Sequence, residues 1–93
     1  MEHKIFPLPQ GNIHYWISKC DPQKPWLVFL PGLTADHTLF EKQLAYFTSH
    51  YNCFVWDAPA HGQSRPFSLT FTMEDMTEDL HNIFKAEEIK NPI

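Results

Sequence analysis

Two short segments of the chain carry residue types and spacing that could do chemistry. One covers residues 30–34 and reads Leu-Pro-Gly-Leu-Thr, and the other covers residues 57–64 and reads Asp-Ala-Pro-Ala-His-Gly-Gln-Ser. Each begins where a short apolar run of strand length ends. Sites in open parallel sheets lie beyond the carboxyl ends of the strands. If the two runs are parallel strands, both segments therefore lie at one candidate functional edge.

The second segment contains a serine and a histidine three residues apart, His61 and Ser64. A serine nucleophile needs small residues two positions before and after it, on a sharp turn between a strand and a helix. Ser64 lies between Gly62 and Pro66 inside a long loop, so we do not expect it to be a nucleophile. Asp57 can accept local backbone hydrogen bonds and Gly62 can form a left-handed turn, which favours a structural role for this loop.

Metal and nucleotide chemistry are not indicated. The six histidines have no ligand spacing such as His-Glu-x-x-His, so we expect no metal site; they are His3, His14, His37, His50, His61 and His81. The three glycines are too dispersed for a phosphate loop or a dinucleotide fingerprint. The two cysteines, Cys20 and Cys53, cannot form a disulfide framework, and we expect them to be packed or surface thiols.

The strands that position these segments follow from local patterns. Lys4–Leu8 and Ile13–Ser18 flank a Pro-Gln-Gly-Asn turn and predict an antiparallel hairpin, with alternate residues of the second stretch on opposite faces. Trp26–Leu30 has no polar face, which is typical of a parallel strand covered on both sides. Asn52–Trp56 is a second short apolar strand.

Two helices are predicted to alternate with these strands. Phe40, Leu44 and Phe47 form the apolar stripe of the first, for which Thr34 or Asp36 is the candidate cap. The second follows a capping-box sequence at residues 72–75, and the helical spacing predicts an apolar core stripe of Met73, Met76, Leu80, Ile83 and Phe84.

The order of elements predicts an α/β fold in which an antiparallel N-terminal hairpin leads into parallel strands flanked by helices. Asn91–Ile93 is expected to start another strand. Two helices cover such a sheet poorly, and one strand of buried type keeps an open edge. We therefore expect residues 1–93 to be the N-terminal portion of a single larger domain.

Composition excludes several classes of protein. Of the 93 residues, 43% are hydrophobic and 15% aromatic, which is too many for a disordered chain. The formal net charge of −4 gives no basic surface for nucleic acid or an anionic membrane. Trp26–Leu30 is too short to span a bilayer, and Met1–Lys4 does not resemble the start of a signal peptide. We expect a cytoplasmic protein, while the oligomeric state stays open.

Taken together, the two segments resemble the N-terminal part of the α/β-hydrolase family. In that family one strand ends in a His-Gly or Pro-Gly turn, and the next ends in Asp-x-Pro-Gly-x-Gly-x-Ser or a near variant. Here Pro31 and Ala60 stand where many members have histidine and glycine. The resemblance covers nearly the whole chain but only about the first third of such a domain.

The resemblance implies a serine-type hydrolase that cleaves an ester, a thioester or a related acyl bond of a small molecule without a cofactor. It implies an oxyanion hole that uses the Leu33 N–H on a turn made by Gly32, although Leu33 could instead pack over the sheet end. Thr34 and His61 are candidates for substrate contact. The triad is not expected in this chain, because the chain has no nucleophile elbow and no acid–histidine pair after one. His61 does not match the family's catalytic histidine, which comes last in the order Ser, Asp/Glu, His.

Other functions stay open at this stage. Members of the family also act as lyases, acyltransferases, and C–C bond or epoxide hydrolases. A non-catalytic homologue fits the same residues, and so does a small binding module that pairs the edge of Trp26–Leu30 with a partner strand.

Overall fold

The computed structural model describes residues 1–32, 35–65, 67 and 72–89. One mixed sheet runs in the order β1-β2-β4-β3, with β1 antiparallel to β2, β2 antiparallel to β4, and β3 parallel to β4. The strands are β1 (Glu2–Leu8), β2 (Gly11–Ser18), β3 (Trp26–Phe29) and β4 (Asn52–Asp57), and the helices are the 3₁₀-helix η1 (His37–Phe40), α1 (Glu41–Phe47) and α2 (Met73–Ala86). The predicted fold class is confirmed.

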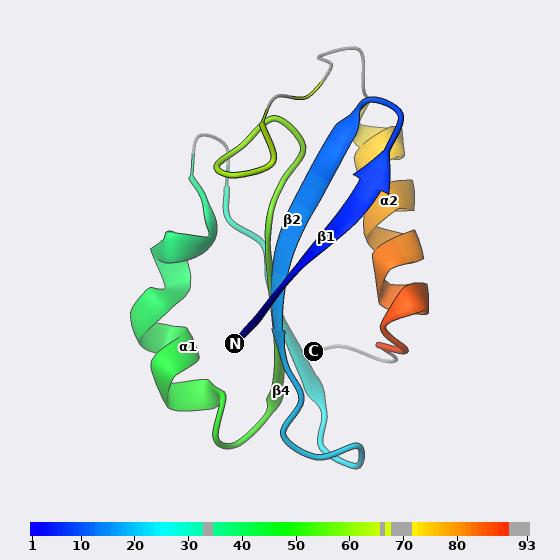
Figure 1. The fold of residues 1–93 in the computed structure, drawn as a ribbon. Coiled ribbons are helices and arrows are strands. Elements are labelled where there is room, and N and C mark those ends of the chain that lie inside the picture. The colour runs from blue at the N-terminus through cyan, green and yellow to red at the C-terminus, as the bar shows by residue number, and fades with distance from the viewer. Residues whose placement is uncertain (33–34, 66, 68–71, 90–93) are drawn as a thin grey trace.

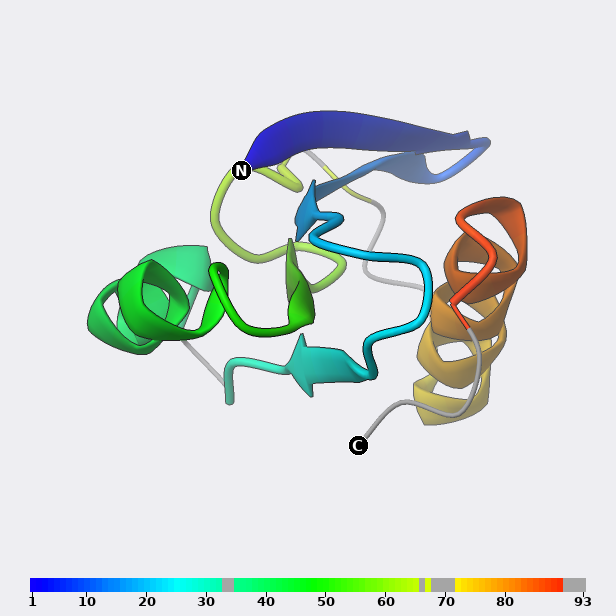
Figure 2. The same cartoon turned by 90° about the horizontal axis from the view of Figure 1, so that it is seen from below.

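The sheet separates two helical layers. Figure 1 shows α1 on one side of the sheet and α2 on the other, and Figure 2 shows the same three layers from below. The β1–β2 hairpin crosses one end of this arrangement. No helix in the described part of the chain combines the length and the apolar character needed to cross a membrane.

Alternation along the strands creates a separate hydrophobic core on each side. On β4, Phe54 and Trp56 belong to the core beneath α2, whereas Cys53 and Val55 belong to the core beneath α1. The hairpin prediction is confirmed on β2, where Ile13, Tyr15 and Ile17 are buried in the α2 core and Trp16 packs in the α1 core. Side chains of successive strand residues point to opposite faces, so β4 serves both cores.

Both β3 and β4 pack against the cores on the two faces of the sheet, but only β4 is fully covered, so the expectation for Trp26–Leu30 is confirmed in part. Every residue of β4 is buried. In β3 only Trp26 is buried, the next three residues are half-buried, and Leu30 is 47% exposed after the strand has ended. The reason is position, since β4 lies between β2 and β3 while β3 is the last strand of the described sheet. The predicted open edge is therefore the outer edge of β3.

Both predicted helix starts are present. The Asp36 carboxylate accepts the Thr38 N–H at 3.0 Å and begins η1, which continues into α1. Thr72 and Asp75 form the reciprocal capping box of α2. Met73 was expected in the core stripe but is 75% exposed, because it lies in the first turn of α2, away from the buried Ile83. The start predicted for a strand at Asn91–Ile93 falls outside the described residues.

The C-terminal end of α2 is attached to the hairpin through a buried carboxylate. Glu87 is only 6% exposed, and it accepts a hydrogen bond of 2.5 Å from the Tyr15 hydroxyl. The Lys4 ammonium lies 3.0 Å from the same carboxylate, and that of Lys19 lies 3.7 Å away. Burial acts to raise the pKa of Glu87, but the bonds from Tyr15 and Lys4, with the two positive charges, hold it below its usual value. The ionised form of Glu87 therefore stabilises the fold.

Glu87→Gln should lower the free energy of unfolding near neutral pH by about 1.5 to 3 kcal/mol, the range for a hydrogen bond to a charged group. A carboxyl whose pKa is depressed by folding contributes stability above its unfolded pKa of about 4.3. That contribution is lost as the pH falls through the lower folded value. The difference between wild type and variant should therefore shrink on acidification, as measured by urea unfolding across this range.

Glu88→Gln is the matched control, because Glu88 is the exposed neighbour of Glu87. This variant should follow the wild-type curve. Parallel pH profiles for wild type and Glu87→Gln would contradict the stabilising role of the ionised carboxylate.

Candidate functional site

The parallel pairing of β3 and β4 brings the two predicted segments to one edge of the sheet. Phe29 lies opposite Val55 in the register, so the chain leaves both strands on the same side. The loop of residues 57–65, yellow-green in Figure 1, begins at Asp57, whose side chain accepts the N–H of His37 in the chain between β3 and α1. The predicted common edge is therefore present.

The Asp57 carboxylate joins these two loops. Asp57 is completely buried, and its Oδ1 accepts the backbone N–H of His37 at 2.7 Å. The same oxygen lies 2.9 Å from Nδ1 of the His37 ring. The other oxygen, Oδ2, accepts the Gln63 N–H at 2.8 Å. One side chain at the end of β4 thus holds the chain after β3 and the loop after β4 together.

Ser64 closes the second loop from the inside. It is completely buried, and its hydroxyl donates to the Asp57 carbonyl oxygen at 2.6 Å while accepting the His14 N–H at 2.8 Å. A hydroxyl used in both directions and shielded from solvent is unsuited to attack a substrate. Its observed role is to attach the loop to β2, in agreement with the structural interpretation of the sequence.

Two positions in this loop adopt left-handed backbone conformations. Gly62 has φ +48°, and a Cβ there would lie 2.4 Å from Asp57 Oδ2. Ala60 has φ 68°, a region that costs a residue with a side chain roughly 1 to 2 kcal/mol. Ala60 therefore adopts a backbone conformation that a glycine would adopt without this cost.

The predicted site residues differ in what the structure says of them. Leu33 and Thr34 lie outside the described residues. Gly32 and Ala35, which flank them, are joined by a bond from the Ala35 N–H to the Gly32 carbonyl oxygen at 3.0 Å. His61 is half-buried in the second loop, with Nδ1 3.0 Å from the Pro59 carbonyl oxygen. The roles expected for Gly32, Leu33, Thr34 and His61 stay predictions.

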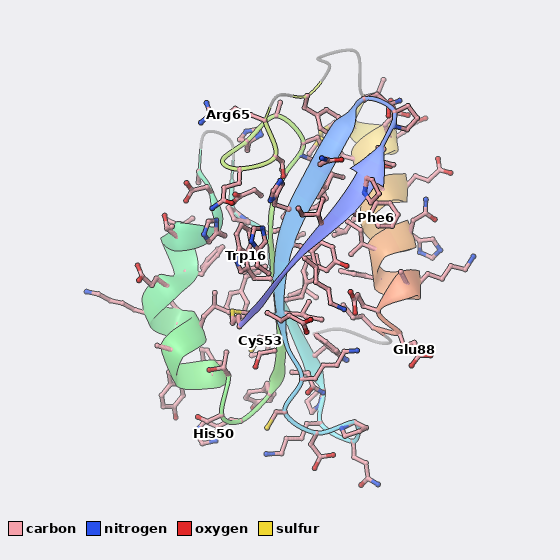
Figure 3. All side chains as sticks on the ribbon, in the orientation of Figure 1. Phe6, Trp16, His50, Cys53, Arg65 and Glu88 are labelled. Carbon is pink, nitrogen blue, oxygen red and sulfur yellow. The ribbon has the colours of Figure 1, made fainter. Side chains whose placement is uncertain are left out.

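His37 is a site residue that the sequence analysis did not single out. Its ring stacks on the indole of Trp16, with ring centroids 3.6 Å apart and an angle of 20° between the planes. Trp16 lies on the α1 side of the sheet, as Figure 3 shows. His37 and Asp57 are 20 positions apart, so no spacing rule connects them. Only the pairing of β3 with β4 could have revealed the contact.

Asp36, His37 and Asp57 also place three possible metal-ligand atoms within 4.8 Å of one another. Spacing along the chain had not indicated this group. Each carboxylate already has partners, since Asp57 faces three nitrogen atoms and Asp36 caps η1. The arrangement is explained by hydrogen bonds within the protein, and it can hold two loops without an ion.

Comparison with known proteins shows which proteins this chain is similar to. A family model described as the alpha/beta hydrolase fold matches residues 25–92. The chain is 33% identical over 66 residues to 3-oxoadipate enol-lactonase 1 of Acinetobacter baylyi, a match that covers 71% of this chain and 24% of that protein. The chain thus spans about a quarter of the length of the curated relative it matches.

Solved structures match more of the chain. A hydrolase from Pseudomonas aeruginosa PA01 superposes with a TM-score of 0.80 at 21% identity, over 97% of this chain and 34% of that one. N-acyl homoserine lactonase AidH, complexed with N-butanoyl homoserine, gives a TM-score of 0.83 at 16% identity, over 100% of this chain and 35% of that one. At these identities the likeness concerns the fold.

Ala60→Gly should raise the free energy of unfolding by about 0.5 to 1 kcal/mol, because relief of the left-handed strain exceeds the added chain entropy of glycine. Gly62→Ala should lower it by roughly 2 to 5 kcal/mol, since the new methyl group meets the Asp57 carboxylate in a strained conformation. Urea unfolding of both variants measures the two changes.

Gly32→Ala is the matched control for this pair. A Cβ at Gly32 meets no atom of the described residues within 4 Å, and the φ of Gly32 lies outside the left-handed region. Its unfolding should change little. A Gly62→Ala protein as stable as wild type would show that the loop does not need the observed approach to Asp57.

Proposed function

The chain belongs to the α/β-hydrolase fold family, and from this premise we propose that it is the N-terminal portion of a hydrolase that cleaves an ester or a related acyl bond. The observation that supports this best is the Asp57 link between the two loops at the carboxyl edge of the sheet. Through these hydrogen bonds, Asp57 holds the loop after β4 against the chain that leads into η1, and both partners belong to this chain. The reaction uses a nucleophile, a histidine and an acid, and needs no cofactor.

Residues 1–93 supply a part of this machinery. The turn of Gly32 and Leu33 provides one N–H of the oxyanion hole, which stabilises the negative charge that builds on the carbonyl oxygen. On the described residues to either side of this turn, the Ala35 N–H donates to the Gly32 carbonyl oxygen and the His37 N–H donates to Asp57. The second N–H belongs to the residue after the nucleophile, which follows this chain.

The substrate is a small acyl compound, open-chain or cyclic, that enters at the same edge. Thr34 and His61 contact it from the two loops. A cyclic ester is favoured by the relatives, since one is named an enol-lactonase and another an N-acyl homoserine lactonase. The acyl carbon is attacked by the downstream nucleophile, and water then releases the acid.

The apolar surface beside β3 supports the placement of this chain within a larger domain. A groove follows the end of β3 and the first turns of α2, and it is lined mainly by apolar side chains: Leu30, Pro31, Trp56, Ala58, Met73, Met76, Thr77 and Leu80. Leu30 and Met73 are among the exposed large hydrophobics. Chain that follows residue 93 covers this groove and adds a strand to the outer edge of β3.

A reducing compartment, the cytoplasm, suits this protein. Cys20 is exposed and Cys53 is buried, and both are free thiols. Burial, with a smaller effect of Cys20, raises the pKa of Cys53 to about 11, which keeps this thiol protonated.

The whole protein should hydrolyse p-nitrophenyl esters or simple lactones and should be labelled by an active-site fluorophosphonate, because both need a nucleophile beside an oxyanion hole. Residues 1–93 alone should do neither, since removal of the nucleophile and base abolishes the covalent route. Product release measured by absorbance and labelling measured by mass spectrometry check the two expectations.

Heat-denatured whole protein is the control for unspecific labelling. Turnover by residues 1–93 alone would overturn the proposal, and so would a whole protein that neither turns over nor is labelled. The latter result would favour a non-catalytic homologue.

A further inference from the structure

We propose that His3 and His14 form a two-histidine binding site for a divalent transition-metal cation, with Cu²⁺ as the preferred ion. Both residues belong to the β1–β2 hairpin, and their rings lie on the side of the sheet where Trp16 packs into the α1 core. The site is independent of the proposed hydrolase activity, because it uses no residue of the loops that follow β3 and β4.

The register of the hairpin brings the two imidazoles together. His3 pairs with Trp16 and Ile5 pairs with His14, so the two histidines are diagonal neighbours on one face of the hairpin. They are 11 positions apart along the chain, a spacing that corresponds to no ligand motif. Nε2 of His3 lies 2.8 Å from Nδ1 of His14. The hairpin therefore offers two nitrogen ligands to one cation.

The distance between the two nitrogens fits adjacent ligands of a tetragonal cation. At a metal–nitrogen bond of about 2.0 to 2.1 Å, two nitrogens at a right angle lie about 2.9 Å apart, and two at the tetrahedral angle lie about 3.3 Å apart. Tetragonal geometry is typical of Cu²⁺ and Ni²⁺, and tetrahedral geometry of Zn²⁺. The observed 2.8 Å is closer to the tetragonal value. Cu²⁺ also has the highest affinity in this series of ions.

The two nitrogens are free to change from a hydrogen bond to metal ligation. Their contact needs one donor and one acceptor, so one nitrogen carries a proton and the other has a lone pair. Within the described residues, neither nitrogen makes a second hydrogen bond. When a cation binds, the shared proton leaves to water or moves to the other nitrogen of its own ring. Both lone pairs can then face the metal.

The surroundings hold both rings near this arrangement. The His3 ring stacks on the indole of Trp16, with centroids 4.5 Å apart and an angle of 10° between the planes. The backbone of His14 is fixed by its N–H, which donates to the Ser64 hydroxyl oxygen at 2.8 Å. His3 is exposed and His14 is half-buried, so a cation can enter from solvent and keep water as its remaining ligands. Little order has to be gained on binding.

Titration of the whole protein with Cu²⁺, followed by tryptophan fluorescence, tests the site. Bound Cu²⁺ should quench Trp16, because this indole stacks on a ligand ring. His3→Gln and His14→Gln should each weaken the binding at least about tenfold, since even partners behind a metal ligand contribute 10- to 100-fold. His81→Gln, on the exposed face of α2, is the matched control and should keep the wild-type affinity.

Two changes in all of these proteins remove competing copper ligands. Cys20→Ser removes the exposed thiol. A short Gly-Ser extension at the N-terminus removes the amino group of Met1 from the neighbourhood of His3. The remaining difference between wild type and His14→Gln then reports on the histidine pair.

Urea unfolding with Ni²⁺ gives a second readout that also needs no activity. A cation that joins β1 to β2 should raise the unfolding midpoint of the protein with both histidines and leave that of His14→Gln unchanged. Equal Cu²⁺ affinity with and without His14, or equal midpoint shifts, would overturn the site. Tighter binding of Zn²⁺ than of Cu²⁺ would overturn the preferred ion. If His14→Gln does not fold, the exposed His3→Gln decides the outcome alone.

Discussion

The structure depends on a charged group that is kept inside the protein. A buried carboxylate is costly unless it is paired and hydrogen-bonded, and Asp57 meets this condition with N–H groups from two different loops. The condition works in both directions. The loops satisfy the carboxylate, and the carboxylate fixes the loops. Because Asp57 is the last residue of the central strand β4, the pairing of β4 with its neighbours determines where Asp57 lies.

The two hydrophobic cores provide the rigidity behind this arrangement. β4 contributes alternate side chains to both, so it cannot slide or turn without disrupting one of them. The buried Glu87 network attaches α2 to the hairpin in a comparable way, with a carboxylate satisfied by a hydroxyl and an ammonium. The fold thus contains two buried acidic side chains, Asp57 and Glu87, and each bonds to partners from distant segments of the chain.

Within the described residues, one weakly covered part is the outer edge of β3 and the groove beside it. This surface is mainly apolar, and it includes Leu30 and Pro31, which directly follow β3. An unpaired strand edge promotes association with another strand. We therefore propose that residues 1–93 supply the two loops held by Asp57, and that the rest of the protein supplies the nucleophile.

Patterns within single elements could be read from the sequence because their physics is local. Alternation along residues 13–18 and the Thr72–Asp75 capping box involve neighbours in the chain and were predicted, and Asp36 was one of two candidate caps. The α/β class and the family followed from the order of such elements and from two turn motifs. Met73 was misplaced because helical spacing defines a stripe but not where along the helix coverage begins.

Tertiary structure decided everything that depends on which strands are neighbours. An apolar run such as Trp26–Leu30 indicates burial, yet only the sheet order placed β4 in the centre and β3 at the edge. The contact of His37 with Asp57 spans 20 positions and arises from parallel pairing, which leaves no periodic signal in the residues between. Local forces therefore chose the elements, and long-range packing chose which of their side chains meet.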